Sequence, residues 1–247
     1  MGTAYLNQGG VAVALGGGSS GPADLAELAV AEGAVTVFPF TDLSGTAVTD
    51  DALGAKAGST YGAGVTLNQA PPGDLLGAVD LAGSNANQRV NVASHNNDNA
   101  GSYVDTFTAE LVAKIDGAGT VGDGSLATLF GINGTHRFLV NATTGAVTVN
   151  SGSGFTAAAG TVPVAGTWFH LLFAYDYYAA TRCKLYVDGA LKTISDGNGQ
   201  ILPAITTFLG YYDGSNYMMN GGLAFFAAYR YPLSAGQAAA HAAMAGL

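Results

Sequence analysis

Short apolar segments closed by turn-forming residues recur along the middle of this sequence, and no long helical pattern interrupts them. Segments of this kind, at regular spacing, are typical of the strands of a β-sandwich or barrel. Glycine agrees with this interpretation, since it supplies 37 of the 247 residues, about twice its average share. The predicted strands are Val35–Phe40, Arg89–Val92, Phe107–Ile115, Ala127–Ile132, Arg137–Val140, Ala146–Val149, Trp168–Tyr175, Lys184–Val187, Ile205–Leu209 and Leu223–Tyr229.

One strand and two turn dipeptides predict local structure in more detail. The segment Trp168–Tyr175 is apolar at both odd and even positions, which predicts a central strand covered on both faces and a largely buried Trp168. Asp188-Gly189 and Asn133-Gly134 each lie between apolar runs. Both dipeptides tolerate positive φ, so they predict two-residue hairpin turns.

The two ends of the chain carry the helical signals. The segment Pro22–Glu32 has Leu25, Leu28 and Ala29 on one face and is followed by glycine, which predicts a short helix. Ser234 and Gln237 have the spacing of a capping box, which predicts a C-terminal helix running to Met244. We therefore divide the chain into an N-terminal arm with a short helix, residues 1–33, and a β domain, residues 34–247.

Charge and cysteine content exclude several classes of protein. The net charge is −9 and no run of Lys or Arg exists, so the sequence offers no surface for a phosphate backbone. No stretch reaches the ~20 continuous apolar residues of a membrane span. The single cysteine, Cys183, excludes an internal disulfide and a multi-cysteine metal site. We expect neither a nucleic-acid nor a membrane partner.

The catalytic motifs in the sequence lack the structural context that their chemistry requires. Gly16–Gly21 fits the dinucleotide pattern G-x-G-x-x-G, but a dinucleotide fold needs repeated βαβ units, and no second helical pattern lies between Gly33 and Ser234. Glutamate occurs only at positions 27, 32 and 110, without the paired spacing that glycoside hydrolysis would require. Glu110 is interpreted as an ordinary surface acid. The sequence therefore predicts a protein that is not an enzyme and has no nucleotide cofactor.

Several stretches together point to one family. GTWFHLLFAYD, LYVDGALK and LGYYDGSNYMMNGGLAFFAAYRYPLSAGQ resemble the C-terminal half of the laminin-G-like, concanavalin A-like jelly-roll domains. VFPFTDLSGTAVTD and Leu81–Ser84 resemble the opening strands of the same family. The resemblance covers roughly residues 34–247. It implies an all-β jelly-roll sandwich of two facing antiparallel sheets with a short C-terminal helix, but it does not imply a single function, since such folds serve glycan binding, adhesion, assembly and hydrolysis.

The resemblance also carries expectations about a metal and a histidine. Many domains of this family hold calcium with Asp side chains and loop carbonyls, which makes Asp42, Asp188 and Asp213 weak calcium candidates. The family commonly has an acid where this sequence has Ala224, so one usual ligand is missing, and turn formation is the alternative role of these aspartates. His170 stands where the family often carries histidine and is interpreted as a hydrogen-bonded core residue.

One loop is the candidate ligand site. Tyr211, Tyr212, Asp213, Asn216 and Tyr217 combine flat aromatic faces with groups that bind sugar hydroxyls. The Asn-rich loop at residues 94–102 is a second candidate. The alternative is that these tyrosines pack on strands and these asparagines occupy turns.

The sequence then favours a non-enzymatic structural protein of a phage or phage-like particle: a capsid decoration, head spike or fibre component located in the virion, with cell-surface polysaccharide as a further partner. The alternative is a glycan-binding module of an exported bacterial protein, extracellular or at the cell surface. Val11–Leu15 alternates within an uncharged, Gly-rich segment, which suits strand addition. We expect residues 1–21 to dock on other virion proteins or to pair protomers of a homo-oligomer; an edge strand on its own domain is the alternative.

Overall fold

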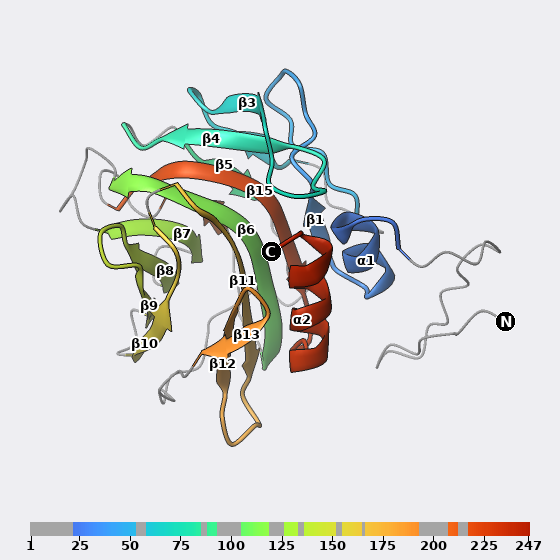
Figure 1. Ribbon diagram of the computed structural model, residues 1–247, viewed down its shortest axis with the longest axis vertical. Helices are drawn as coiled ribbons and strands as arrows, with labels where there is room; N and C mark the ends of the chain where they lie inside the picture. The colour runs from blue at the N-terminus through green and yellow to red at the C-terminus, as the bar shows by residue number, and fades with distance from the viewer. Residues whose placement is uncertain are drawn as a thin grey trace, which may run out of the picture.

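Two facing antiparallel β-sheets, with two short helices on one outer side, make up the protein (Figure 1). The structure is a computed structural model that describes residues 22–52, 58–84, 88–92, 105–118, 126–132, 136–151, 155–164, 166–192, 207–211 and 217–247. The predicted all-β sandwich with a C-terminal helix is confirmed.

The strands of the described residues divide into a larger and a smaller sheet. The larger, eight-stranded sheet has the spatial order β13 (Ala190–Lys192), β12 (Cys183–Val187), β11 (Trp168–Asp176), β6 (Thr106–Ala118), β15 (Met219–Tyr229), β4 (Ala78–Ala82) and β3 (Thr66–Gln69), with β1 (Thr36–Phe38) beside β15. The smaller, seven-stranded sheet has the order β10 (Phe155–Thr161), β9 (Ala146–Ser151), β8 (His136–Asn141), β7 (Leu126–Ile132), β14 (Thr207–Leu209), β5 (Val90–Val92) and β2 (Thr60–Tyr61).

The main core lies between the sheets and is rich in aromatic side chains. Phe130 and Phe138 of the smaller sheet stack with ring centroids 4.0 Å apart, and Phe138 meets Phe173 of β11 edge-on at 4.4 Å. A second apolar cluster lies on the outer face of the larger sheet, beneath the helices. Strand β11 contributes alternate residues to both clusters, so the prediction of a central strand covered on both faces is confirmed.

Trp168 stands at the start of β11 and packs against the cluster under the helices. The prediction of a largely buried indole agrees with this position, although Trp168 is less completely covered than His170 and Leu172, which are fully buried.

Both helices pack on the outer face of the larger sheet (Figure 1). Helix α1 (Leu25–Ala31) begins after Asp24, whose side chain accepts a hydrogen bond from Glu27 N, and it buries Leu25 and Ala29. Helix α2 (Ala235–Met244) begins with the predicted capping box of Ser234 and Gln237. Among the described residues, no helix combines the length and the apolar character that crossing a membrane requires.

The predicted hairpin at Asp188-Gly189 is confirmed. Both residues have positive φ, 49° and 72°, and Val187 pairs with Ala190 across the turn, as a type I′ turn requires. Asn133-Gly134 and residues 1–21 lie outside the described residues.

Candidate functional site

A row of outward-facing residues crosses five strands of the smaller sheet. Thr60 of β2 pairs with Asn91 of β5, Asn91 with Phe208 of β14, Phe208 with Gly131 of β7, and Gly131 with Arg137 of β8. The sequence neighbours of these residues, such as Val90, Leu209 and Phe138, point into the core and are buried. Side chains alternate between faces along a strand, so the row lies on the outer face.

At one end of this row an arginine packs against two aromatic rings, Phe208 and Tyr211, which are themselves in edge-to-face contact. The guanidinium carbon of Arg89 lies 4.7 Å from the ring centroid of Phe208 and 4.6 Å from that of Tyr211. Its Nε donates to Asn91 Oδ1 at 2.8 Å, and Asn91 Nδ2 in turn donates to Thr60 Oγ1 at 3.1 Å. Aromatic faces attract a guanidinium placed in this way, so Arg89 is fixed in orientation before any ligand arrives.

A second arginine and tyrosine pair stands on the other side of β14. The guanidinium carbon of Arg137 lies 5.1 Å from the ring centroid of Tyr217. The Tyr217 carbonyl accepts a hydrogen bond from Thr128 N at 2.9 Å, which ties this tyrosine to β7. Arg137 and Phe208 are two strands apart, about 10 Å at normal strand spacing. We call the residues Arg89, Asn91, Phe208, Tyr211, Arg137 and Tyr217 the arginine–tyrosine surface.

The structure brings together part of the predicted ligand loop. Tyr211 and Tyr217 lie on this surface, one beside each arginine. The ring of Tyr211 is buried, with 6% of the residue exposed, so it supports Arg89 rather than offering an open face. Tyr212, Asp213 and Asn216 lie outside the described residues, as does the whole 94–102 loop.

Sequence reasoning missed Arg89, Phe208 and Arg137. One signal was available: each arginine lies in or next to a predicted strand of a chain with only eight Lys and Arg residues in all. The structure places both guanidinium groups on one face of this acidic protein. Arginine recognises carboxylates through paired hydrogen bonds.

The calcium candidates that the structure describes already have protein partners. Asp42 accepts hydrogen bonds from Thr49 N at 3.0 Å, Thr49 Oγ1 at 2.6 Å and Tyr61 Oη at 2.7 Å. Burial opposes ionisation of Asp42, but these hydrogen bonds outweigh it and lower its pKa. Asp188 accepts from His170 N at 2.9 Å, while Asp213 lies outside the described residues. Among the described residues, no three His, Cys, Asp or Glu side chains are arranged to hold a metal ion.

A buried ionic cluster lies beneath α2 and corrects the prediction made for Glu110. Glu110, expected at the surface, is fully buried on β6. Its carboxylate contacts His170 Nε2 at 2.8 Å and His241 Nδ1 at 2.9 Å, and accepts a hydrogen bond from Tyr229 Oη at 2.8 Å. The prediction that His170 is a hydrogen-bonded core residue is confirmed. The surface assignment of Glu110 was wrong because its partners come from strands and a helix far away in the sequence.

The cluster holds an ion pair. Burial raises the pKa of Glu110, but the charge of His241 and the hydrogen bonds from both histidines lower it to about 2. Burial lowers the pKa of His241, but the charge and hydrogen bond of Glu110 and the contact with Glu32 raise it to about 10. His241 Nε2 lies 3.1 Å from Glu32 Oε2. The protonated imidazole of His241 therefore faces one carboxylate at each of its nitrogens, Glu110 at Nδ1 and Glu32 at Nε2.

This cluster has the residue types of an acid–base site but not the access. Glu110, His170 and His241 have no exposed surface, so a substrate cannot reach them. Gln237 Nε2 also donates to Glu32 Oε2 at 2.9 Å. The cluster therefore fastens α2 and the end of α1 to the sheet, and its role is structural.

Comparison with known proteins identifies relatives of the fold. A family model described as the concanavalin A-like lectin/glucanases superfamily, Laminin_G_3, matches residues 83–239, well over half of the chain. No curated protein sequence matches the chain significantly.

Among solved structures, the receptor-binding domain of botulinum neurotoxin type G is similar, with a TM-score of 0.63 and 12% identity over 85% of this chain and 51% of that one. The serotype D ligand-binding domain in complex with N-acetylneuraminic acid has a TM-score of 0.55 and 13% identity, over 85% of this chain and 50% of that one. Domain 4 of AbnA, a GH43 extracellular arabinanase from Geobacillus stearothermophilus solved with arabinotriose, has a TM-score of 0.57 and 18% identity, over 85% of this chain and 98% of that one. The chain spans about half the length of the neurotoxin domains. At these identities the likeness shows the fold alone.

Proposed function

The chain belongs to the concanavalin A-like lectin/glucanases superfamily, and we propose that it is a non-enzymatic carbohydrate-binding module whose ligand contacts the arginine–tyrosine surface. One observation carries this proposal: two arginines, each placed over aromatic rings, lie on the same outer face of the smaller sheet. Guanidinium donors bind carboxylates and hydroxyls. The rings available for stacking against the apolar face of a sugar are those of Phe208 and Tyr217, which are partly exposed, since Tyr211 is buried.

The chemistry of the surface favours an acidic saccharide. Its side chains include two guanidinium groups, which are charge-assisted donors for a sugar carboxylate. The absence of paired carboxylates among these side chains supports binding without hydrolysis. Two of the similar structures were solved with N-acetylneuraminic acid and with arabinotriose, which supports carbohydrate as the ligand class.

Calorimetric titration with sialyllactose and with lactose tests the proposal. We expect sialyllactose to bind about tenfold or more tightly than lactose, since a hydrogen bond to a charged group contributes roughly 1.5–3 kcal/mol. Arg89→Ala and Arg137→Ala are each expected to weaken sialyllactose binding by about tenfold or more. Circular dichroism of each variant verifies that the fold is retained.

Arg182→Ala is the matched control. Arg182 also stacks on a tyrosine, 4.6 Å from the ring centroid of Tyr177, but it lies next to β12 in the larger sheet. We expect this variant to bind as the wild type does. Equal loss of affinity in Arg182→Ala, or no binding of either sugar by the wild type, contradicts the proposal.

We also propose that the module forms part of a phage or phage-like particle, as a decoration, spike or fibre component. The low content of charged residues, 10%, and the uncharged segment before Asp24 support an assembled protein. Removing residues 1–21 should leave a folded domain that no longer sediments with particles or oligomerises. Unchanged assembly of the truncated protein refutes this role and favours the exported bacterial module.

A further inference from the structure

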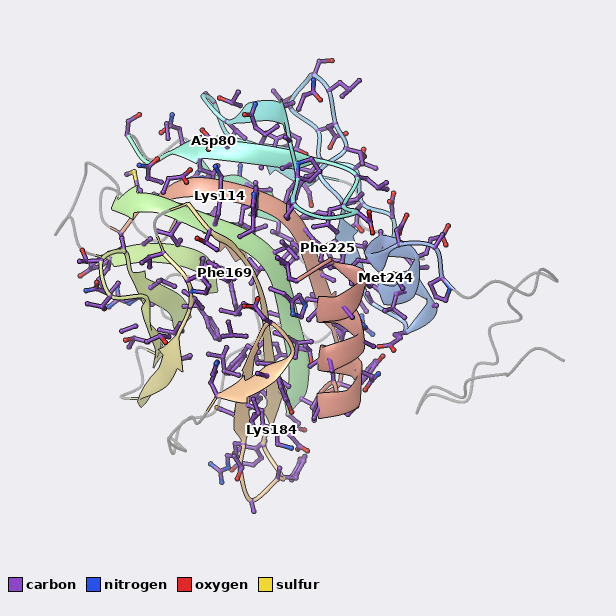
Figure 2. The ribbon with its side chains drawn as sticks, in the orientation of Figure 1. Asp80, Lys114, Phe169, Lys184, Phe225 and Met244 are labelled. Atoms are coloured by element: carbon purple, nitrogen blue, oxygen red, sulfur yellow. The ribbon has the colours of Figure 1, made fainter. Side chains whose placement is uncertain are left out.

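The outer face of the larger sheet is only partly covered by the helices. Beyond the covered area, one row crosses four neighbouring strands: Asp80 of β4 pairs with Gly222 of β15, Gly222 with Lys114 of β6, and Lys114 with Trp168 of β11. Figure 2 shows Asp80 and Lys114 on the part of the sheet away from α2, which carries Met244. This row lies on the opposite side of the sandwich from the arginine–tyrosine surface.

Trp168 lies across the row with its ring against the backbone of Gly222. A Cβ atom on Gly222 would come within 2.7 Å of Trp168 Cη2 and 3.2 Å of Cζ2, so the six-membered end of the indole occupies the space above this glycine. Trp168 is nevertheless partly exposed. The indole is thus held in a fixed position against this glycine, and part of it remains open to a ligand.

Polar side chains surround this indole. Lys114 Nζ lies 5.6 Å from the centre of the Trp168 ring and forms an ion pair with Asp116 Oδ2 at 3.0 Å. Asp80 faces the same side, one strand beyond Gly222, and is half-buried. Burial and the charge of Asp116 raise the pKa of Asp80, while Lys114 opposes them. The two carboxylates outnumber the single ammonium, so this face repels anions.

We propose that Trp168, Lys114, Asp80 and Asp116 form a second binding surface, which takes a neutral saccharide with one sugar ring stacked on the indole. The carboxylates accept hydrogen bonds from sugar hydroxyls, and Lys114 donates one. The excess of acidic groups selects against uronic and sialic acids, so the two faces of the sandwich take saccharides of different charge. The inference goes beyond the proposed function, with which it shares only the class of ligand.

Trp168 provides its own reporter, because it is the only tryptophan in the chain. The experiment titrates the full-length protein with neutral trisaccharides of glucose, galactose, mannose and arabinose and follows the indole emission. We expect at least one trisaccharide to give a saturable change. Asp80→Ala and Lys114→Ala should each weaken that binding by about fivefold or more, as expected for the loss of a hydrogen bond.

Lys184→Ala is the matched control for Lys114→Ala. Lys184 is exposed on β12 of the same sheet and lies far from Lys114 in Figure 2. We expect the wild-type titration for this variant. Arg137→Ala should also leave the Trp168 titration unchanged, so that failure of the arginine–tyrosine surface and failure of the Trp168 surface are distinguishable.

Three outcomes overturn the inference. The first is an indole emission that no neutral trisaccharide changes. The second is that both Asp80→Ala and Lys114→Ala bind the trisaccharide, as measured by indole emission, with the affinity of the wild type. The third is a response to a lysine-rich peptide that salt abolishes and no sugar reproduces, which would identify the surface as a docking site for cationic protein segments. Calorimetry of Trp168→Phe, which retains an aromatic ring, should show weakened binding of the same trisaccharide.

Discussion

Replacing Glu110 by glutamine tests the buried cluster, because the substitution keeps the size of the side chain and removes its charge. The imidazolium of His241 would then retain only Glu32, which is partly exposed, with a side-chain exposure of 22%. Removing one partner from a buried ion pair costs about 3–5 kcal/mol. Since glutamine can still accept hydrogen bonds, we expect a loss near the lower limit, about 3 kcal/mol. In a chain of this length such a loss lowers Tm by roughly 6–12 °C.

The pH dependence of stability carries a second signature. The pKa of His241 is raised from 6.5 to about 10, so its contribution is complete below pH 6.5 and is lost as the pH rises to about 10. The pKa of Glu110 is lowered from 4.5 to about 2, so its contribution is complete above pH 4.5 and is lost as the pH falls to about 2. The cluster therefore stabilises the fold most between pH 4.5 and 6.5. In Glu110→Gln, the free energy of unfolding should fall less than in the wild type both below pH 4.5 and above pH 6.5.

Urea denaturation followed by Trp168 emission measures both effects. Glu27→Gln is the matched control, since Glu27 is exposed on α1 and its charge contributes at most about 1 kcal/mol to the helix N-terminus. The reasoning is refuted if Glu110→Gln lies within 1 kcal/mol of Glu27→Gln at pH 6. It is also refuted if the loss of stability between pH 6.5 and 10 is as large in Glu110→Gln as in the wild type.

Three smaller predictions concern stability. Ser234→Ala should lower the free energy of unfolding by about 1 kcal/mol through loss of the capping box. Asp42→Asn should lower the free energy of unfolding by about 1–3 kcal/mol. This loss should be the same with calcium as with EDTA, since protein donors already occupy this carboxylate. Gly145→Ala should cost more than Gly45→Ala, because both have positive φ but only at Gly145 would a Cβ lie 2.1 Å from a backbone oxygen, that of Val162. Equal costs for the two glycine variants, measured in urea, would contradict this explanation.

Ten of the strands that the structure describes were predicted from sequence, whereas β2, β3, β4, β10 and β13 were not. Each predicted strand overlaps a strand of the structure, and β11 differs by one residue at one end. Strand β4 was missed although it buries Ala78, Val79 and Leu81, so burial alone did not make a strand predictable. The TLNQ residues of β3 are exposed or half-buried, and β3 pairs with β4 through an irregular register. Such a strand forms because its neighbour offers backbone groups, and its own side chains carry no periodic signal.

The site residues were harder to predict, because they come together through register and topology. Glu110 and His241 are 131 residues apart, and no local pattern links them. The pattern of β6 gave no signal either: the other residues on the face that carries Glu110 are Thr106, Thr108, Val112, Lys114 and Asp116. Such a mostly polar face is typical of a strand with one side in water, so the sequence favoured an exposed Glu110.

The same two strands carry the cluster and the Trp168 surface, and this arrangement explains why the open part of the sheet lies where it does. On β11, His170 and Trp168 are two residues apart and point to the same face. On β6, Glu110 and Lys114 are four residues apart and share that face. The ionic cluster fastens α2 over His170 and Glu110, so the helix covers that half of both strands. Trp168 packs against the edge of the cluster under the helices, and the indole and Lys114 lie where that cover ends. The ion pair thus sets the boundary between the buried and the open part of this face.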